Sequence, residues 1–119
     1  MEKSPKVSII LPCLNEEESI GIYLDSIKEV LKNSKISSEI IVVDNASSDK
    51  SKEIVKNKKI KNLKIIEEKT RGYGSAYLRG IKESKGEYIF MTDSDGTYDF
   101  RNFPRFVKKL EQGNDFVIG

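Results

Sequence analysis

The sequence predicts an α/β domain built around a mainly parallel sheet. Short apolar runs, several of them β-branched, alternate with longer segments whose apolar residues recur every three or four positions, as is typical of strands and helices that follow one another. The chain has 119 residues, the size of a single domain. Its longest apolar runs fall far short of the roughly 18 to 20 residues that a bilayer helix needs.

A strand and a helix open the chain. Residues 7–11 are apolar enough for a buried strand, and we expect Pro12 to stop it. Residues 16–33 carry an apolar stripe at helical spacing, with Asn15 as the expected cap and acidic residues in the first turn.

The remaining elements continue the same alternation. Residues 40–43 form a β-branched strand that ends at Asp44, and Ser47 or Ser48 is the expected cap of a short helix over 50–56. A strand, a helix, a strand, a helix and the start of another strand follow, over residues 63–66, 75–85, 88–91, 103–110 and 116–118. Because no turn or cap follows the last strand, we interpret the chain as a truncated piece of a longer domain; the alternative is a five-stranded domain that ends there.

The charge balance argues against nucleic-acid binding, since 21 Lys and Arg face 19 Asp and Glu for a formal net charge of +2. Lysines are nevertheless concentrated between Lys50 and Lys64, which fits either a solvated surface or contact with anionic lipid head groups or nucleic acid. The single cysteine excludes an internal disulfide. The absence of histidine excludes a Ser-His or Cys-His catalytic pair within this sequence. This composition favours the reducing cytoplasm.

Two acidic residues follow the strand expected at 88–91. Ligands of an open parallel sheet bind beyond the carboxyl ends of its strands. Asp93 and Asp95 are two positions apart and project to one face of an extended chain, where two carboxylates repel unless a cation lies near them. Mg²⁺ and Mn²⁺ take such oxygen ligands and leave positions for a substrate phosphate. We expect either a cation site that holds a diphosphate or a solvated acidic turn.

Two other strand ends contain candidate ligand contacts. Asp44 can accept hydrogen bonds from ribose hydroxyls or a base N–H, or can cap a helix. The loop that begins at Arg71 contains Gly72 and Gly74, but Tyr77 stands where a dinucleotide-binding fingerprint has its third glycine. We therefore reject a Rossmann dehydrogenase. The loop is either a plain turn or one that approaches a ligand closely, with Arg71 available for phosphate or ribose.

Residues 93–97 also match the aspartyl-phosphatase pattern D-x-D-G-T, in which the first Asp is the nucleophile. That pattern normally opens its domain. Too few residues follow Thr97 for the remaining catalytic elements, so we reject this function.

Four motifs, taken in order, resemble those of family 2 glycosyltransferases of GT-A fold, especially the dolichyl- or polyprenyl-phosphate hexose synthases. They are Leu11–Glu17, Ile41–Asp49, Gly72–Ala76 and Asp93–Asp99. Each motif is weak alone, but four in this order and spacing are specific. The resemblance covers residues 1–119, which would be the N-terminal, nucleotide-sugar-binding half of a catalytic domain with a Rossmann-like α/β/α sandwich.

The resemblance implies an enzyme that transfers a hexose from a UDP- or GDP-linked donor to an acceptor, with a polyprenyl or dolichyl phosphate as the expected acceptor. Asp93 and Asp95 would be catalytic, binding Mg²⁺ or Mn²⁺ against the donor diphosphate. The residues that would contact the donor are Pro12, Asn15, Glu16, Asp44, Arg71, Gly72, Gly74 and Asp93. Because the acceptor-binding half is missing, we expect little turnover from this chain alone. Its expected location is the cytoplasm, with peripheral contact at the cytoplasmic face of the membrane.

Two other functions compete with this one. An inactive module could bind a partner, or form homo-oligomers, through an open sheet edge at residues 116–119. A nucleotidyltransferase ranks last, because the chain lacks a recognisable phosphate-binding glycine loop near its N-terminus.

Overall fold

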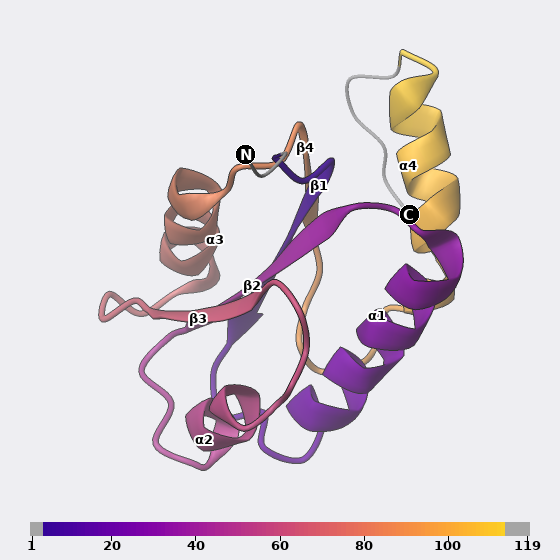
Figure 1. Ribbon diagram of the computed structural model, residues 1–119. Coiled ribbons are helices and arrows are strands. Elements are labelled where there is room, and N and C mark those ends of the chain that lie inside the picture. Colours follow the sequence, from indigo (N-terminus) through magenta and orange to yellow (C-terminus); the bar gives the residue numbers. More distant parts are fainter. Residues whose placement is uncertain (1–3, 114–119) are drawn as a thin grey trace.

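The structure, a computed structural model, describes residues 4–113 (Figure 1). One all-parallel sheet has the strand order β3-β2-β1-β4, with β1 Val7–Cys13, β2 Ser38–Asp44, β3 Leu63–Glu67 and β4 Tyr88–Met91. The helices are α1 Ile20–Ser34, α2 Ser51–Lys56, α3 Tyr73–Glu83 and α4 Phe103–Glu111, and the 3₁₀ turn η1 Phe100–Asn102 precedes the last of them. The predicted parallel α/β architecture is confirmed. The strand and sheet edge expected at 116–119 lie outside the described residues.

Helices cover both faces of the sheet. α3 lies on one face, and α1, α2 and α4 lie on the other (Figure 1). β1 and β2 are buried along their whole length, as expected for central parallel strands covered on both sides. The larger core, on the α1 face, includes the stacked rings of Phe100 and Phe103, whose centroids are 4.6 Å apart. Among the described residues, no helix combines the length and apolarity needed to cross a membrane.

α3 lies close to β1 because of a glycine in its third turn. A Cβ at Gly80 would be 2.4 Å from the Cγ2 atom of Ile10. Close helix–sheet packing, which dinucleotide-binding folds achieve with the third glycine of their fingerprint, is therefore achieved here at Gly80 and not at position 77. The helix packs its small residues Ala76 and Gly80 on the sheet, while Leu78 is 69% exposed.

We predicted that Pro12 stops β1, and this prediction is wrong. The strand continues through Pro12 to Cys13 and keeps its register with β2, where Pro12 lies opposite Val43. The Pro12 carbonyl accepts a hydrogen bond from the Ser94 hydroxyl at 2.8 Å, on the side where β4 has already ended at Met91. The missing N–H of proline therefore breaks no ladder pairing.

The predicted helix caps are also wrong. α1 begins only at Ile20, because Asn15 adopts a left-handed conformation (φ 54°) and its side-chain oxygen accepts the N–H groups of Ser48 and Asp49. Neither of the two serines predicted to cap α2 does so. The Asp49 carboxylate accepts the N–H of Ser51, the first residue of that helix, at 2.9 Å. Local sequence could not show that these side chains join two different loops.

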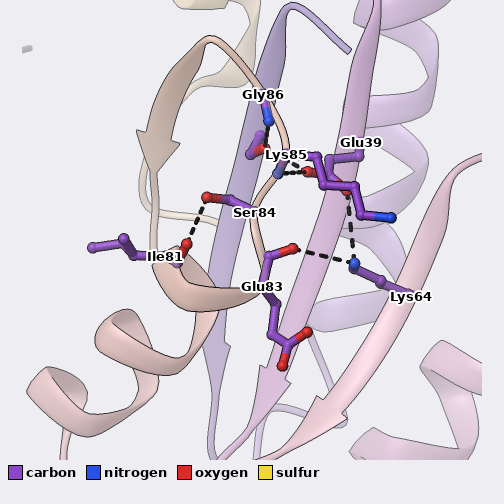
Figure 2. Close-up of polar contacts among 8 residues, drawn as sticks. Glu39, Lys64, Ile81, Glu83, Ser84, Lys85 and Gly86 are labelled. Carbon is purple, nitrogen blue, oxygen red and sulfur yellow. Dashed lines mark hydrogen bonds and ion pairs between the residues drawn. The ribbon is translucent and has the colours of Figure 1, made fainter. Parts of the chain in front are cut away.

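A buried carboxylate fixes the connection between α3 and β4. Glu39, on β2, accepts the Ser8 hydroxyl at 2.5 Å. It also accepts the Lys85 N–H at 2.6 Å (Figure 2). Ser8 in turn accepts the N–H of Gly86 at 2.8 Å, and an added Cβ at Gly86 would be only 2.5 Å from the Ser8 nitrogen. The ammonium group of Lys64 lies 3.8 Å from the Glu39 carboxylate and supplies the countercharge that a buried anion needs. This cluster holds the chain against β1 just before β4 begins.

Replacing Glu39 tests the role of this cluster. Glu39→Ala leaves the Lys85 N–H and the Ser8 hydroxyl without their acceptor, so we expect the free energy of unfolding in urea to fall by about 1–3 kcal/mol. The control is Glu83→Ala, which removes only the half-exposed ion pair with Arg79 and should cost about 0.3–0.5 kcal/mol. Equal losses in the two variants would contradict a structural role for the buried carboxylate.

Candidate functional site

The carboxyl ends of β1, β2 and β4 meet at one edge of the sheet, as parallel pairing requires. Cys13 lies opposite Asp44 in the register of β1 and β2, and the Asn45 N–H donates to the Cys13 carbonyl at 2.8 Å. On the other side of β1, the Ser94 hydroxyl donates to the carbonyl of Pro12. The sheet thus brings together three of the segments in which we predicted donor contacts.

Buried neighbours orient Asp93 and Asp95 toward solvent. Thr92 and Ser94 are 5% and 3% exposed, whereas both aspartates are exposed. The Thr92 hydroxyl is hydrogen-bonded to the hydroxyl of Tyr23 from α1 at 3.0 Å. The chain leaves strand geometry after Met91 and turns at residues 94–95, so the extended segment that we assumed is not present. Anchoring of Thr92, before the pair, and of Ser94, between them, exposes both carboxylates, and not strand alternation.

One oxygen of each carboxylate is held by a protein donor. The hydroxyl of Tyr77, on α3, donates to Asp93 Oδ1 at 3.1 Å. Asp95 Oδ1 accepts the N–H of Thr97 at 3.0 Å and its hydroxyl at 2.8 Å. These bonds hold the pKa of Asp95 below its ordinary value, and the bond from the Thr97 backbone has the largest effect. Within residues 4–113, the second oxygen of each aspartate accepts no hydrogen bond.

Asp44 contains a buried acceptor without a partner. The residue is 3% exposed, and its Oδ2 accepts the N–H of Ser47 at 3.3 Å. Its Oδ1 is buried and has no hydrogen-bond partner in the described part of the chain. An unpaired buried acceptor costs free energy, so Asp44 Oδ1 is a candidate contact for a donor from outside the chain. Asp44 does not cap α2, whose N-cap residue is Lys50 and whose first N–H, that of Ser51, is accepted by Asp49.

Asn45, which we did not predict, positions the glycine-containing loop. It is 4% exposed, and its amide nitrogen donates to the carbonyls of Glu68 and Thr70 at 2.9 and 2.8 Å. Its side-chain oxygen accepts the N–H of Gly72 at 2.8 Å. The loop therefore lies next to Asp44, with Arg71 exposed. The sequence contained an indication of this role. A loop without secondary structure needs hydrogen-bond partners for its backbone, and an asparagine side chain offers both a donor and an acceptor.

Asn15 and Glu16 lie where the loops after β1 and β2 are joined. The Asn15 N–H donates to the Ser47 hydroxyl at 3.0 Å, and the Glu16 N–H donates to the Ser51 hydroxyl at 2.8 Å. Pro12 is buried in β1 beside them. These contacts give the three residues a structural role at the edge of the site, and their contact with a nucleotide stays a prediction.

The lowered pKa of Asp95 gives a testable dependence on pH. Since its hydrogen bonds favour the ionised form, their contribution to stability is present above the ordinary pKa of 3.8 and is lost as the pH falls through the lower folded-state value. Thr97→Val removes one of the bonds, so we expect the Asp95 pKa to rise toward 3.8 in a ¹³C NMR titration of the carboxyl carbon. Asp99, whose pKa is lowered by Arg101, should not change and is the internal control. An unchanged Asp95 pKa would show that the hydroxyl contact is absent in solution.

Comparison with known proteins agrees with this geometry. The family model described as glycosyl transferase family 2 matches residues 8–119. The chain is similar to the low-salt glycan biosynthesis hexosyltransferase Agl6 of Haloferax volcanii, with 36% identity over 117 residues, 98% of this chain and 27% of that protein. It is also similar to the dolichol-phosphate mannosyltransferase of Pyrococcus furiosus, with 31% identity over 116 residues, 96% of this chain and 32% of that protein.

A solved structure shows the same fold. The mannosyltransferase PcManGT of Pyrobaculum calidifontis, in complex with GDP-Man and Mn²⁺, is similar with a TM-score of 0.79 and 29% identity over 97% of this chain and 34% of that chain. The GT-A type of α/β fold that the motifs led us to expect is therefore confirmed. The chain spans between about a quarter and about a third of the length of these three proteins. With a family model that covers nearly all of it, the chain belongs to glycosyl transferase family 2.

Proposed function

We propose that residues 1–119 are the nucleotide-sugar-binding part of a glycosyltransferase that moves a hexose from a UDP- or GDP-linked donor to a polyprenyl or dolichyl phosphate. One observation carries the proposal. At a single edge of the sheet, the unpaired buried acceptor Asp44 Oδ1 lies across β1 from the exposed carboxylates of Asp93 and Asp95. A nucleotide sugar supplies what both need: hydrogen-bond donors on its ribose and base, and a diphosphate that binds a cation.

The nucleoside would lie between Asp44 and the loop that Asn45 holds. Asp44 Oδ1 would accept a hydrogen bond from a ribose hydroxyl or a base N–H. At Gly72 and Gly74, an added Cβ would meet no heavy atom within 4 Å, so the loop has an open surface for a ligand. Gly72 also has a φ of +124°, which favours glycine. The exposed Arg71 would pair with a phosphate, and Pro12, Asn15 and Glu16 would border the other side.

Asp93 and Asp95 fit a divalent cation, Mg²⁺ or Mn²⁺. Each offers a carboxylate oxygen that accepts no protein hydrogen bond in the described residues, and these cations prefer oxygen ligands. Among those residues no group of three or more acidic, cysteine or histidine side chains is placed to hold a metal ion, so the donor phosphates and water would complete the ligand set. When bound, the cation would offset the negative charge that develops on the departing nucleoside diphosphate.

The chemistry of a lipid phosphate and the name of one relative support this class of acceptor. A lipid phosphate already carries an anionic oxygen, so no strong general base is needed. The Pyrococcus furiosus relative is named a dolichol-phosphate mannosyltransferase, which supports this class. Since the chain spans only part of such proteins, we propose that it binds the donor and turns over little by itself.

A lipid acceptor would place the enzyme in the cytoplasm, at the cytoplasmic face of a membrane. The basic stretch from Lys50 to Lys64 is only partly available for such contact. Three of its lysines form ion pairs within the fold, in the pairs Lys52–Glu67, Lys58–Asp25 and Lys64–Glu39. The lysines that remain exposed for contact with anionic head groups are Lys50, Lys56, Lys59 and Lys61.

Metal-dependent stabilisation by a nucleotide tests the proposal. We expect UDP or GDP to raise the thermal unfolding midpoint more with Mn²⁺ than with EDTA, since a ligand at 100 times its Kd adds about 2.7 kcal/mol. Asp95→Asn should abolish the difference. Asp99→Asn, which affects a carboxylate that is already bound to Arg101 in the same segment, should leave it intact. Absence of any Mn²⁺-dependent shift with either nucleotide would overturn the proposal.

A further inference from the structure

Tyr77 connects the hydrophobic core on the α3 face with the pair of exposed acids. Its half-buried ring packs against the small core formed by Ile10, Ile41, Val43 and Ala76. Its hydroxyl reaches Asp93 Oδ1, which comes from the segment that follows β4.

The hydrogen bond from Tyr77 restrains the side chain of Asp93. The residue is exposed, and an exposed carboxylate otherwise samples several rotamers. Asp95 is restrained by Thr97, its own neighbour in sequence, whereas the donor to Asp93 comes from a different element of the fold. The two carboxylates are therefore alike in one respect: a protein donor holds Oδ1 of each and leaves Oδ2 for another partner.

We propose that Tyr77 is a positioning residue for the cation site: by holding Asp93 Oδ1 it orders the carboxylate before the cation arrives, and the cation binds through the remaining oxygen. This inference rests on the proposed function, because it needs a cation at Asp93 and Asp95. Hydrogen bonds from surrounding residues commonly orient metal-binding carboxylates in this way, and their loss weakens metal binding by about 10- to 100-fold. The presence of Tyr77 excluded a dinucleotide-binding fingerprint, and we propose a role for the same residue in the cation site.

Tyr77→Phe isolates the hydroxyl, because phenylalanine keeps the ring in the core. The matched control is Tyr88→Phe, which removes a hydroxyl from the first residue of β4, at the end of the strand away from the two acids. Two quantities are measured on the 119-residue chain. The first is the Kd of Mn²⁺, from the electron paramagnetic resonance signal of free Mn²⁺ with UDP or GDP at the concentration of the chain, compared with a titration of the same nucleotide without the chain. The second is the order of the Asp93 side chain, from NMR couplings of its β-protons without metal.

We expect Tyr77→Phe to raise the Kd of Mn²⁺ about tenfold and to average the Asp93 couplings, with nucleotide binding in EDTA unchanged. Tyr88→Phe should match the unsubstituted chain in both quantities and in nucleotide binding. If the hydroxyl instead competes with the cation for Asp93, Tyr77→Phe will bind Mn²⁺ more tightly, and the inference is wrong. It is equally wrong if both the Kd and the couplings are unchanged. Failure of the unsubstituted chain to bind Mn²⁺ would overturn the proposed function and this inference together.

Discussion

The pairing of β1 with a parallel neighbour on each side is the constraint on which the rest of the site depends. β1 is buried throughout, and its register with β2 and β4 decides which residues emerge together at the carboxyl edge. Asp44 ends β2 and Asp93 follows β4, and these two acids lie at the same edge of the sheet only because both strands run in the direction of β1. The acids would have no common ligand in an antiparallel arrangement.

β4 needs additional support because it is a short strand with few neighbours. It has four residues, pairs only with β1 among the described strands, and leaves Met91 48% exposed. Polar contacts fix it at both ends: the buried Glu39 before it begins, and Ser94 with Thr92 after it ends. Burying polar groups to hold a strand is costly unless each has a partner, and these have them. The result is a defined position for the two acids that leave the strand.

Sequence patterns were sufficient for the elements and insufficient for the contacts between loops. The strand over 88–91 was predicted with its observed bounds, because its apolar residues are flanked by polar ones and glycine. Pro12 and Asn15 were misinterpreted, since their roles depend on Ser94 and on the loop after β2, which local rules do not consider. The positions of the candidate acids followed from topology. The donors that hold them, such as Tyr77, follow only from three-dimensional packing.

A crystal of the chain grown with Mn²⁺ and UDP or GDP gives the most direct measurement of the central claim, that Asp93 and Asp95 bind a cation which holds a diphosphate. We expect the anomalous signal of manganese beside both carboxylates, with the nucleotide phosphates on the metal and a ribose or base donor at Asp44 Oδ1. Manganese bound elsewhere, or a nucleotide that leaves Asp44 and both acids without contact, would contradict it.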